Sequence, residues 1–229
     1  MYSSIVKLAP IVFSQPLKAL QYGAICNKYR SYTMISSRAT YIANLAVAQS
    51  VAHVDGCVIE CGVWRGAMIA GISEIMGSDR NYFLFDSFEG LPPAQAIDGE
   101  EAIFWQADKS SSTYYNNCKA EMEFATRAME IAKVKNYKLI KGWFQDSLPD
   151  FIPPQKIALL RLDGDWYDST LVCLEHLSKY MAKDGVIIID DYYYWDGCAK
   201  AVHDFISKNN LNWRVTQAYG LVCVIDLHN

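Results

Sequence analysis

The chain has 229 residues, of which 52% are hydrophobic and 20% are charged. This length suits one large domain, and the composition excludes a disordered chain. The 25 acidic residues outnumber the 21 basic ones, which argues against a surface that binds nucleic acid by counterion release. Every apolar run is far shorter than the roughly 20 residues that a membrane span requires. We therefore expect neither a nucleic-acid partner nor a membrane span.

The N-terminal region differs in pattern from the rest of the chain. Residues 1–50 contain no strand-like alternation, and residues 38–54 carry an apolar stripe at helical spacing. The sequence therefore predicts a helical arm or lid over 1–50 and the main domain over 51–229. An apolar arm of this length also favours self-association, so we expect a homo-oligomer.

From residue 57 onward, short β-branched runs alternate with amphipathic segments. The alternation predicts βαβ units and a mostly parallel sheet with helices on both faces. The predicted strands cover 57–61, 82–85, 138–141, 157–162, 186–189, 213–217 and 221–226. The predicted helices cover 67–77, 119–134, 168–183 and 198–208. Residues 90–118 are expected to form a long irregular loop, which in a compact domain is usually functional.

The last two predicted strands are separated only by residues 218–220. A connection this short cannot make a parallel crossover, so these strands should pair antiparallel. Five parallel strands followed by such a hairpin form the layout of the class I methyltransferase sheet, a Rossmann-like α/β fold. We therefore predict this fold, with one antiparallel strand in the C-terminal hairpin and a helical N-terminal arm.

The first strand ends in the motif IECGVWRG, which spans residues 59–66. A glycine at this point, Gly62, lets a ligand approach the backbone. The acidic Glu60 before it suits the ammonium group of a cofactor that carries an amino acid. The motif is not G-x-G-x-x-G, so a dinucleotide dehydrogenase loses its main support. The alternative is that Gly62 only supplies a positive φ in a tight turn.

Two further strand ends carry candidate binding residues. Asp86 follows the second strand at about the position where an acid hydrogen-bonds ribose hydroxyls in doubly wound folds. The alternative is that Asp86 or Ser87 caps the next helix. Trp143 and Phe144 follow the third strand and are placed to cover an adenine ring, although two aromatic residues there also suit a core.

Acidic residues follow both the fourth and the fifth strand. Asp163 and Asp165 end the fourth, and Asp190 and Asp191 end the fifth. These strands are neighbours in the predicted sheet, so their carboxylates should crowd one crevice, which is costly unless a cation or shared protons neutralise them. Oxygen ligands without His or Cys select Mg²⁺, Ca²⁺ or Mn²⁺. The pattern predicts a hard divalent cation, the alternative being that Asp190 or Asp191 caps the next turn.

The seven cysteines are scattered and lie mostly within apolar segments, and no C-x-x-C pair occurs. This usage is typical of reduced thiols that serve as small hydrophobic residues. We therefore expect a cytoplasmic protein without a metal–thiolate site.

Five motifs stand in register along the chain: IECGVWRG, LFDSFEGLP, KGWFQDSLP, LRLDGDWYDST and IIIDDYYYWDGCAKAV. Together they resemble the macrocin/mycinamicin O-methyltransferase (TylF-like) family, from about residue 33 to the C-terminus. The resemblance implies S-adenosylmethionine as methyl donor and a divalent ion, usually Mg²⁺. It implies methylation of a hydroxyl, in the first place of a sugar, on a glycosylated natural product or glycan.

The resemblance also implies roles for individual residues. The ion would be held by Asp163, Asp190 and Asp191, and Asp165 would be the general base. The donor site would comprise Glu60, Cys61, Gly62, Val63, Trp64, Asp86, Ser87, Trp143 and Phe144.

Two alternatives remain open at this point. A catechol-type O-methyltransferase has a similar acidic constellation, but its base is commonly a lysine near the first metal ligand, and residues 164–167 contain none. A non-catalytic nucleotide-binding module is the second alternative. The four intact aspartates argue against it, because a degenerate copy has no reason to retain mutually repelling carboxylates.

Overall fold

The computed structural model describes residues 16–227. Within this range one seven-stranded sheet has the order β3-β2-β1-β4-β5-β7-β6. Strands β1 to β5 run parallel to one another, and β7 is antiparallel to both β5 and β6, as predicted. The strands are β1 (Cys57–Cys61), β2 (Asn81–Asp86), β3 (Asn136–Lys141), β4 (Ile157–Leu162), β5 (Met181–Ile189), β6 (Arg214–Ala218) and β7 (Val222–Asp226).

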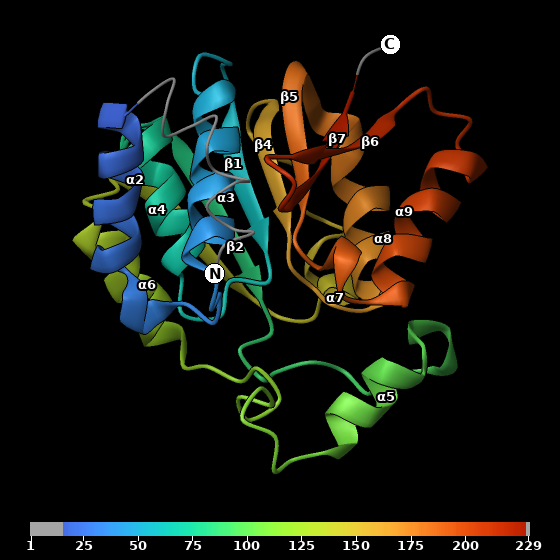
Figure 1. The fold of residues 1–229 in the computed structure, drawn as a ribbon. Coiled ribbons are helices and arrows are strands. Elements are labelled where there is room, and N and C mark those ends of the chain that lie inside the picture. Colours follow the sequence, from blue (N-terminus) through green and yellow to red (C-terminus); the bar gives the residue numbers. More distant parts are fainter. Residues whose placement is uncertain (1–15, 228–229) are drawn as a thin grey trace.

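Helices cover both faces of the sheet (Figure 1). One face carries α2 (Pro16–Lys28), α3 (Arg38–Ser50), α4 (Ala67–Met76) and α6 (Met122–Ile131). The other face carries the short α7 (Phe144–Ser147), α8 (Tyr167–Leu177) and α9 (Asp196–Lys208).

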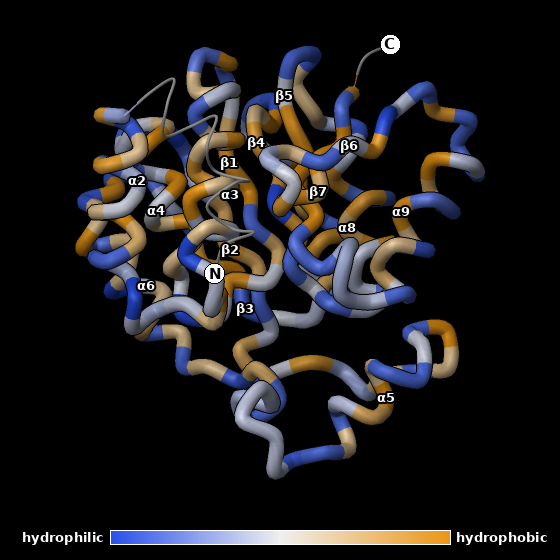
Figure 2. The backbone as a smooth tube through the Cα atoms, viewed as in Figure 1, coloured by the Kyte–Doolittle hydropathy of each residue, from blue (hydrophilic) through white to orange (hydrophobic). Residues whose placement is uncertain are grey.

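Adjacent residues of each central strand point into different halves of the core, because side chains alternate along a strand. Val58 and Ile188 pack beneath α3 and α4, whereas Ile59 and Ile189 pack beneath α8 and α9. The most hydrophobic stretches accordingly follow the central strands (Figure 2). The sequence therefore has the pattern of a sheet that is buried on both sides.

The described part of the predicted arm packs tightly on the domain. Tyr22 and Leu45 are buried in the core under α2 and α3, and the Tyr41 hydroxyl donates to the Ala67 carbonyl oxygen at 2.7 Å. Residues 1–15 of the arm lie outside the described residues. A domain boundary at residue 50 and a lid function of this region stay predictions.

The structure differs from the predicted elements between residues 168 and 189. The predicted helix 168–183 ends at Leu177, and a short 3₁₀ turn leads into β5, which begins at Met181 and not at residue 186. The polar Lys183 and Asp184 interrupt the apolar pattern, yet Met181 still pairs with Ile157 across an irregularity in the ladder. Because the first residues of β5 include polar ones, no run of apolar residues marks where the strand begins, and the sequence pattern predicts too late a start.

Residues 90–118, here called the insertion, extend beyond the carboxyl edge of the sheet (Figure 1). The expected irregular loop contains a helix, α5 (Glu100–Ala107), which sequence analysis missed. The insertion is anchored next to the end of β4. Its anchoring hydrogen bonds run from Trp166 Nε1 to the Pro92 oxygen (2.9 Å), from Gln95 Nε2 to Asp168 Oδ2 (3.0 Å), and from the Tyr167 amide to Asp98 Oδ1 (2.8 Å).

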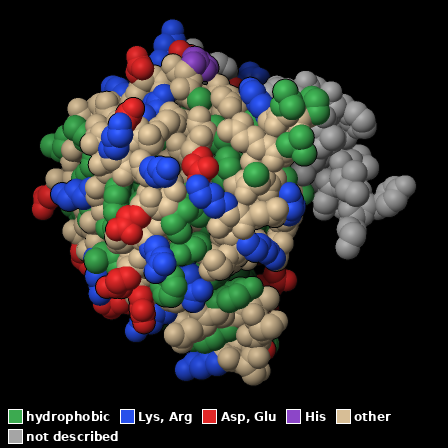
Figure 3. Space-filling view, turned by 90° about the vertical axis from the view of Figure 1, so that its left-hand side faces the viewer, with side chains coloured by type: hydrophobic (Ala, Val, Ile, Leu, Met, Phe, Trp, Pro, Cys, Tyr) green, Lys and Arg blue, Asp and Glu red, His purple; other side chains and the backbone are tan. Residues whose placement is uncertain are grey.

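Across residues 16–227 no helix is both long and apolar enough to cross a membrane. All seven cysteines are free thiols, and all but Cys118 are buried. On the side of the molecule where α2 and α6 lie, acidic and basic side chains are interspersed with hydrophobic ones (Figure 3).

Candidate active site

The ends of β1 and β4 meet in direct backbone contact at Gly62. The Asp163 amide donates to the Cys61 carbonyl oxygen at 2.8 Å. Gly62 has φ +89°, and a Cβ added there would lie 1.7 Å from the backbone carbonyl oxygen of Asp163. The glycine therefore serves close backbone approach as well as positive φ, so the alternative raised from the sequence describes part of its role.

Arg161 is a buried cation that sequence analysis missed. Its side chain is 1% exposed, and its Nη1 atom lies 2.8 Å from Glu60 Oε1 and 2.7 Å from Asp163 Oδ2. Its Nη2 atom lies 2.5 Å from Asp190 Oδ1. The crowding of acids predicted from the sequence is thus partly neutralised by the protein itself. The available signal was an arginine inside the otherwise apolar run IALLRL.

Glu60 lies in this buried network, at the inner wall of a pocket described below. It is 1% exposed, and burial raises the pKa of its carboxyl to about 8 although Arg161 opposes the shift. Its Oε2 atom is buried and has no hydrogen-bonding partner among the described residues. One acceptor position of Glu60 therefore stays free for a donor that enters the site.

Three aspartates converge in front of Arg161. Carboxylate oxygens of Asp163, Asp165 and Asp191 lie within 4.8 Å of one another. The Asp165 amide donates to Asp191 Oδ2 at 2.9 Å, and Trp195 Nε1 donates to Asp165 Oδ1 at 2.8 Å. Asp190 contributes to the same region but directs Oδ1 at Arg161. All four aspartates singled out from the sequence are therefore neighbours. Asp163, Asp165, Asp190 and Asp191 are together called the aspartate cluster.

The electrostatics of this cluster favour a positive charge. Burial, followed by the negative charge of Asp163, raises the pKa of Asp165 to about 7. Burial raises the pKa of Asp190 to about 6 against the influence of Arg161, and burial together with the other aspartates raises that of Asp191. A hard cation bound to these oxygens would displace their protons, and its charge would offset the mutual repulsion of the carboxylates. The donor set of oxygens fits Mg²⁺ or a similar ion.

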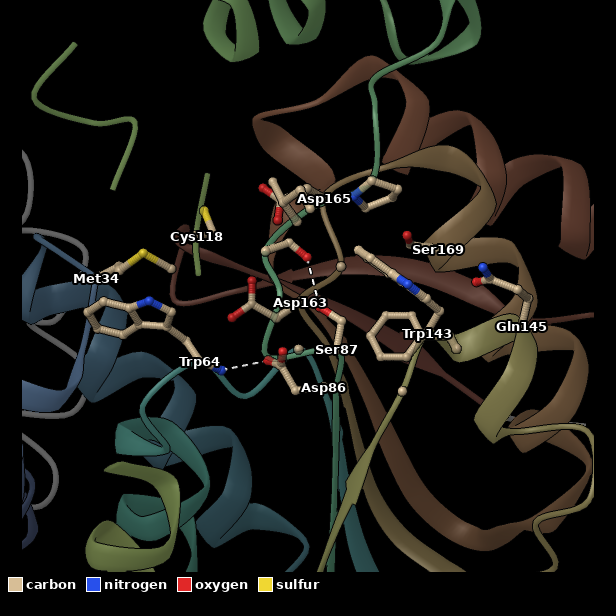
Figure 4. A pocket seen from close by; sticks show the side chains of 17 residues that line it. Met34, Trp64, Asp86, Ser87, Cys118, Trp143, Gln145, Asp163, Asp165 and Ser169 are labelled. Atoms are coloured by element: carbon tan, nitrogen blue, oxygen red, sulfur yellow. Dashed lines mark hydrogen bonds between the residues drawn. The ribbon is translucent and has the colours of Figure 1, made fainter. Parts of the chain in front are cut away.

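A first pocket opens beside the cluster, between the ends of β1, β2 and β3 (Figure 4). Six of the nine predicted donor-site residues line it: Gly62, Trp64, Asp86, Ser87, Trp143 and Phe144. Of the other three, Glu60 and Val63 line a second pocket, whereas Cys61 packs into the core beneath α8.

Asp86 fixes the loop that follows β1. Its Oδ2 atom accepts the amides of Val63 at 2.7 Å and Trp64 at 2.8 Å, and its Oδ1 atom accepts the Phe88 amide at 2.6 Å. Asp86 therefore holds loop backbone, but no helix directly follows it, so the helix cap stated as the alternative is not formed. A carboxylate has further lone pairs, so ribose binding by Asp86 stays a prediction.

The second pocket lies on the other side of the aspartate cluster and has walls of two kinds. Aromatic side chains of the insertion and of the β5–α9 connection form one wall, including Trp105, Tyr194 and Trp195. The connector between α2 and α3 forms the other and brings hydroxyl groups, including those of Thr33 and Ser36. Sequence analysis did not assign these residues to the site.

The two pockets share part of their walls. The residues that line both are Met34, Trp64, Cys118, Asp163 and Asp165. In Figure 4, Asp163 lies between Trp64 and Cys118 on one side and Trp143 and Ser169 on the other. Two ligands, one in each pocket, would therefore meet at the aspartates.

Residues 26–224 match the model of the macrocin O-methyltransferase (TylF) family. The chain belongs to this family. The tetracenomycin-C rhamnosyl 4'-O-methyltransferase of Streptomyces olivaceus is 30% identical over 175 residues, which cover 73% of this chain and 64% of that protein. Demethyldecarbamoylnovobiocin O-methyltransferase of Streptomyces niveus is 31% identical over 168 residues, covering 68% of this chain and 60% of that protein. The chain thus spans less than two thirds of each of these relatives.

The likeness extends to solved structures of O-methyltransferases. The O-methyltransferase NovP superposes with a TM-score of 0.71 at 25% sequence identity, covering 86% of this chain and 83% of NovP. The class I methyltransferase fold predicted from the strand order is therefore confirmed for this family member.

Proposed function

We propose that this protein is an O-methyltransferase that uses S-adenosylmethionine and a divalent metal ion. Its acceptor is a hydroxyl group, of a sugar in the first place, on a glycosylated natural product or glycan. The observation that carries the proposal is the wall shared by the two pockets, where Asp163 and Asp165 face both. A donor in the first pocket and an acceptor in the second would meet at these carboxylates, as an in-line transfer requires.

The first pocket is proposed as the donor site. When bound there, S-adenosylmethionine supplies an electrophilic methyl group. Trp143 and Phe144 offer aromatic faces to an adenine, and Asp86 offers its free lone pairs to ribose hydroxyls. The family assignment and the six predicted residues that line this pocket support this placement.

The aspartate cluster is proposed as the metal site. Asp163, Asp190 and Asp191 would hold the ion, as the resemblance implied. A bound Mg²⁺ lowers the pKa of a hydroxyl that contacts it. The convergence of carboxylate oxygens supports the site. The carboxylate oxygen of Asp165 lies within 4.8 Å of those of Asp163 and Asp191, as expected of oxygens that share one ion, whereas Asp190 directs Oδ1 at Arg161. The point to test is therefore which of Asp165 and Asp190 is the metal ligand.

Asp165 is proposed as the general base. In the transfer the acceptor O–C bond would form as the sulfonium S–CH₃ bond breaks and S-adenosylhomocysteine leaves, and the hydroxyl proton would pass to the Asp165 carboxylate. A base with a pKa near the working pH is well suited to this, and burial brings the pKa of Asp165 to about 7.

Two substitutions separate metal binding from base catalysis. Asp190→Asn should weaken Mg²⁺ binding, and part of the activity should return at high Mg²⁺. Asp165→Asn should leave the affinities for Mg²⁺ and S-adenosylmethionine near wild type while kcat falls on the order of 10²–10⁴-fold. Calorimetry and steady-state kinetics give both quantities. Recovery of Asp165→Asn by added Mg²⁺ would instead make Asp165 a metal ligand.

Both alternatives from the sequence have direct tests. Turnover of catechols and not of glycosides would favour a catechol-type enzyme. Residues 164–167, which contain no lysine, and the rhamnosyl substrate named for one relative favour the sugar. Calorimetry with S-adenosylmethionine, with and without Mg²⁺, tests the non-catalytic module, because absence of binding in both conditions would leave the enzyme without its donor.

We also infer a cytoplasmic location and a homo-oligomer. The free, mostly buried thiols support a reducing compartment. Fractionation of the producing cells and size-exclusion chromatography with light scattering measure the two properties.

A further inference from the structure

We propose that Trp195 is a positioning residue for the reaction, which aims the Asp165 carboxylate through a hydrogen bond from its indole nitrogen. This inference rests on the proposed role of Asp165 as the base. It concerns a residue in the aromatic run 192–195, to which neither the family resemblance nor the comparisons assign a role.

Three hydrogen bonds connect Trp195, Asp165 and Asp191 in a closed ring. The Trp195 amide donates to the Asp191 carbonyl oxygen at 3.0 Å. The Asp165 amide donates to Asp191 Oδ2 at 2.9 Å, and Trp195 Nε1 donates to Asp165 Oδ1 at 2.8 Å, which closes the ring. The ring joins the end of β4 to the end of β5. Both the backbone and the side chain of Asp165 are therefore fixed relative to Asp191.

The backbone of Asp165 needs such support. Asp165 has φ +58°, a left-handed conformation that is unfavourable for a residue with a Cβ. Residues in such conformations persist where surrounding contacts over-determine them. With Oδ1 engaged by Trp195, Oδ2 is the oxygen without a hydrogen bond from the described residues. The geometry thus presents one defined oxygen of Asp165 to the acceptor.

Packing holds the Trp195 ring in place. Its centroid lies 5.2 Å from that of Trp166 and 5.9 Å from that of Trp105, both edge to face. Trp166 is buried and follows Asp165 directly, whereas Trp105 comes from α5 of the insertion. Two indoles from two other segments therefore keep the Trp195 ring oriented. A ring held this way loses little entropy when it makes its hydrogen bond.

Trp195→Phe removes the N–H donor and keeps an aromatic ring in the cluster. Because a hydrogen bond to a charged group is involved, kcat should fall about 10- to 100-fold. The acceptor KM and the calorimetric affinities for S-adenosylmethionine and Mg²⁺ should stay close to wild type. Trp213→Phe is the matched control, because Trp213 packs on Phe205 and lines neither pocket.

A double-mutant cycle distinguishes positioning from general stability. If Trp195 acts through Asp165 alone, Trp195→Phe should lower kcat in the wild-type protein but not further in Asp165→Asn. A purely structural loss would be additive in the cycle. Should Trp195→Phe fail to fold, judged by its Tm, Trp195→Tyr retains a ring without the indole donor and enters the same cycle.

Several outcomes would overturn the inference: an unchanged kcat for Trp195→Phe, an equal loss in Trp213→Phe, additivity in the cycle, or an effect confined to the acceptor KM. None of these touches the proposed function. Wild-type activity of Asp165→Asn would refute the proposed base, and with it the foundation of this inference.

Discussion

Gly62 illustrates how one residue sets the geometry of two strands. It lies where β1 leaves the sheet, and its missing Cβ lets the chain touch the Asp163 backbone. Any side chain would have to push Asp163 away, because the obstacle is a backbone carbonyl and not a flexible side chain. The position of the aspartate cluster relative to the first pocket therefore depends on this glycine.

Gly62→Ala should reduce kcat severely and destabilise the fold, since it combines positive φ with the clash against Asp163. Gly77→Ala is the control, because Gly77 also has positive φ, +106°, but its Cβ would meet nothing within 4 Å. We expect Gly77→Ala to lower the free energy of unfolding by about 1–3 kcal/mol with kcat unchanged. Urea unfolding and kinetics provide the comparison. Equal stability losses for both variants would mean that the contact with Asp163 relaxes.

The four aspartates could be predicted as neighbours because the carboxyl ends of adjacent parallel strands meet at one edge. Arg161 could not be assigned in the same way. Its partner Glu60 stands directly opposite in the β1–β4 register, and register is not visible in one sequence. The sequence therefore supplied the negative charges of the site but not the buried cation among them.

Among the elements, the insertion depends most on a few polar contacts. The buried Asp98 accepts the amide of Tyr167, the first residue of α8, at 2.8 Å and the Gln95 amide at 2.7 Å. A carboxylate at a helix N-terminus is stabilised by the free amides there. The base of the insertion is thus tied to the segment that directly follows the aspartates of β4.

Asp98→Ala should loosen the insertion and raise the acceptor KM, because Trp105 of the insertion lines the second pocket. Proteolysis within residues 92–118 should become faster. Asp108→Ala is the matched control, since Asp108 is exposed and its side chain accepts hydrogen bonds from neighbouring serines of the same segment. Identical cleavage rates for wild type and Asp98→Ala would show that the other anchors suffice.

The sheet and its helices could be predicted because they repeat regular apolar patterns. The helix α5 escaped prediction because its eight residues stand between a proline pair and a serine run, which both signal loops. It is exposed over much of its surface, with Phe104 75% accessible, so no amphipathic stripe marks it. Its position depends on long-range anchors such as Asp98, which local sequence does not reveal.

At the scale of the whole molecule, the aspartate cluster makes stability depend on pH and on cations. Asp165 and Asp190 have folded-state pKa values of about 7 and about 6. These exceed the usual value of about 4 for an unfolded chain, so the folded state binds more protons between these limits. The contribution of these groups to stability is therefore lost as the pH rises through the folded-state values.

Mg²⁺ should raise the Tm more at pH 8 than at pH 5.5, because at the lower pH the ion must displace protons from the cluster. Differential scanning fluorimetry at constant ionic strength measures both shifts. Asp191→Asn, which removes a proposed ligand, should shrink the shift at pH 8. A shift of equal size at both pH values would contradict a site made of these carboxylates.

Strand β7 has a consequence for the order in which the protein matures during synthesis. It is inserted between β5 and β6 and pairs with β5 over Val186–Ile189, just before Asp190 and Asp191. Within the described sheet, residues 222–226 form the last strand to be synthesised. Until then β5 is an open sheet edge, free to pair with other chains. The strand that carries half of the aspartate cluster is thus the last to be enclosed, which makes the nascent protein most vulnerable to aggregation just before its site is complete.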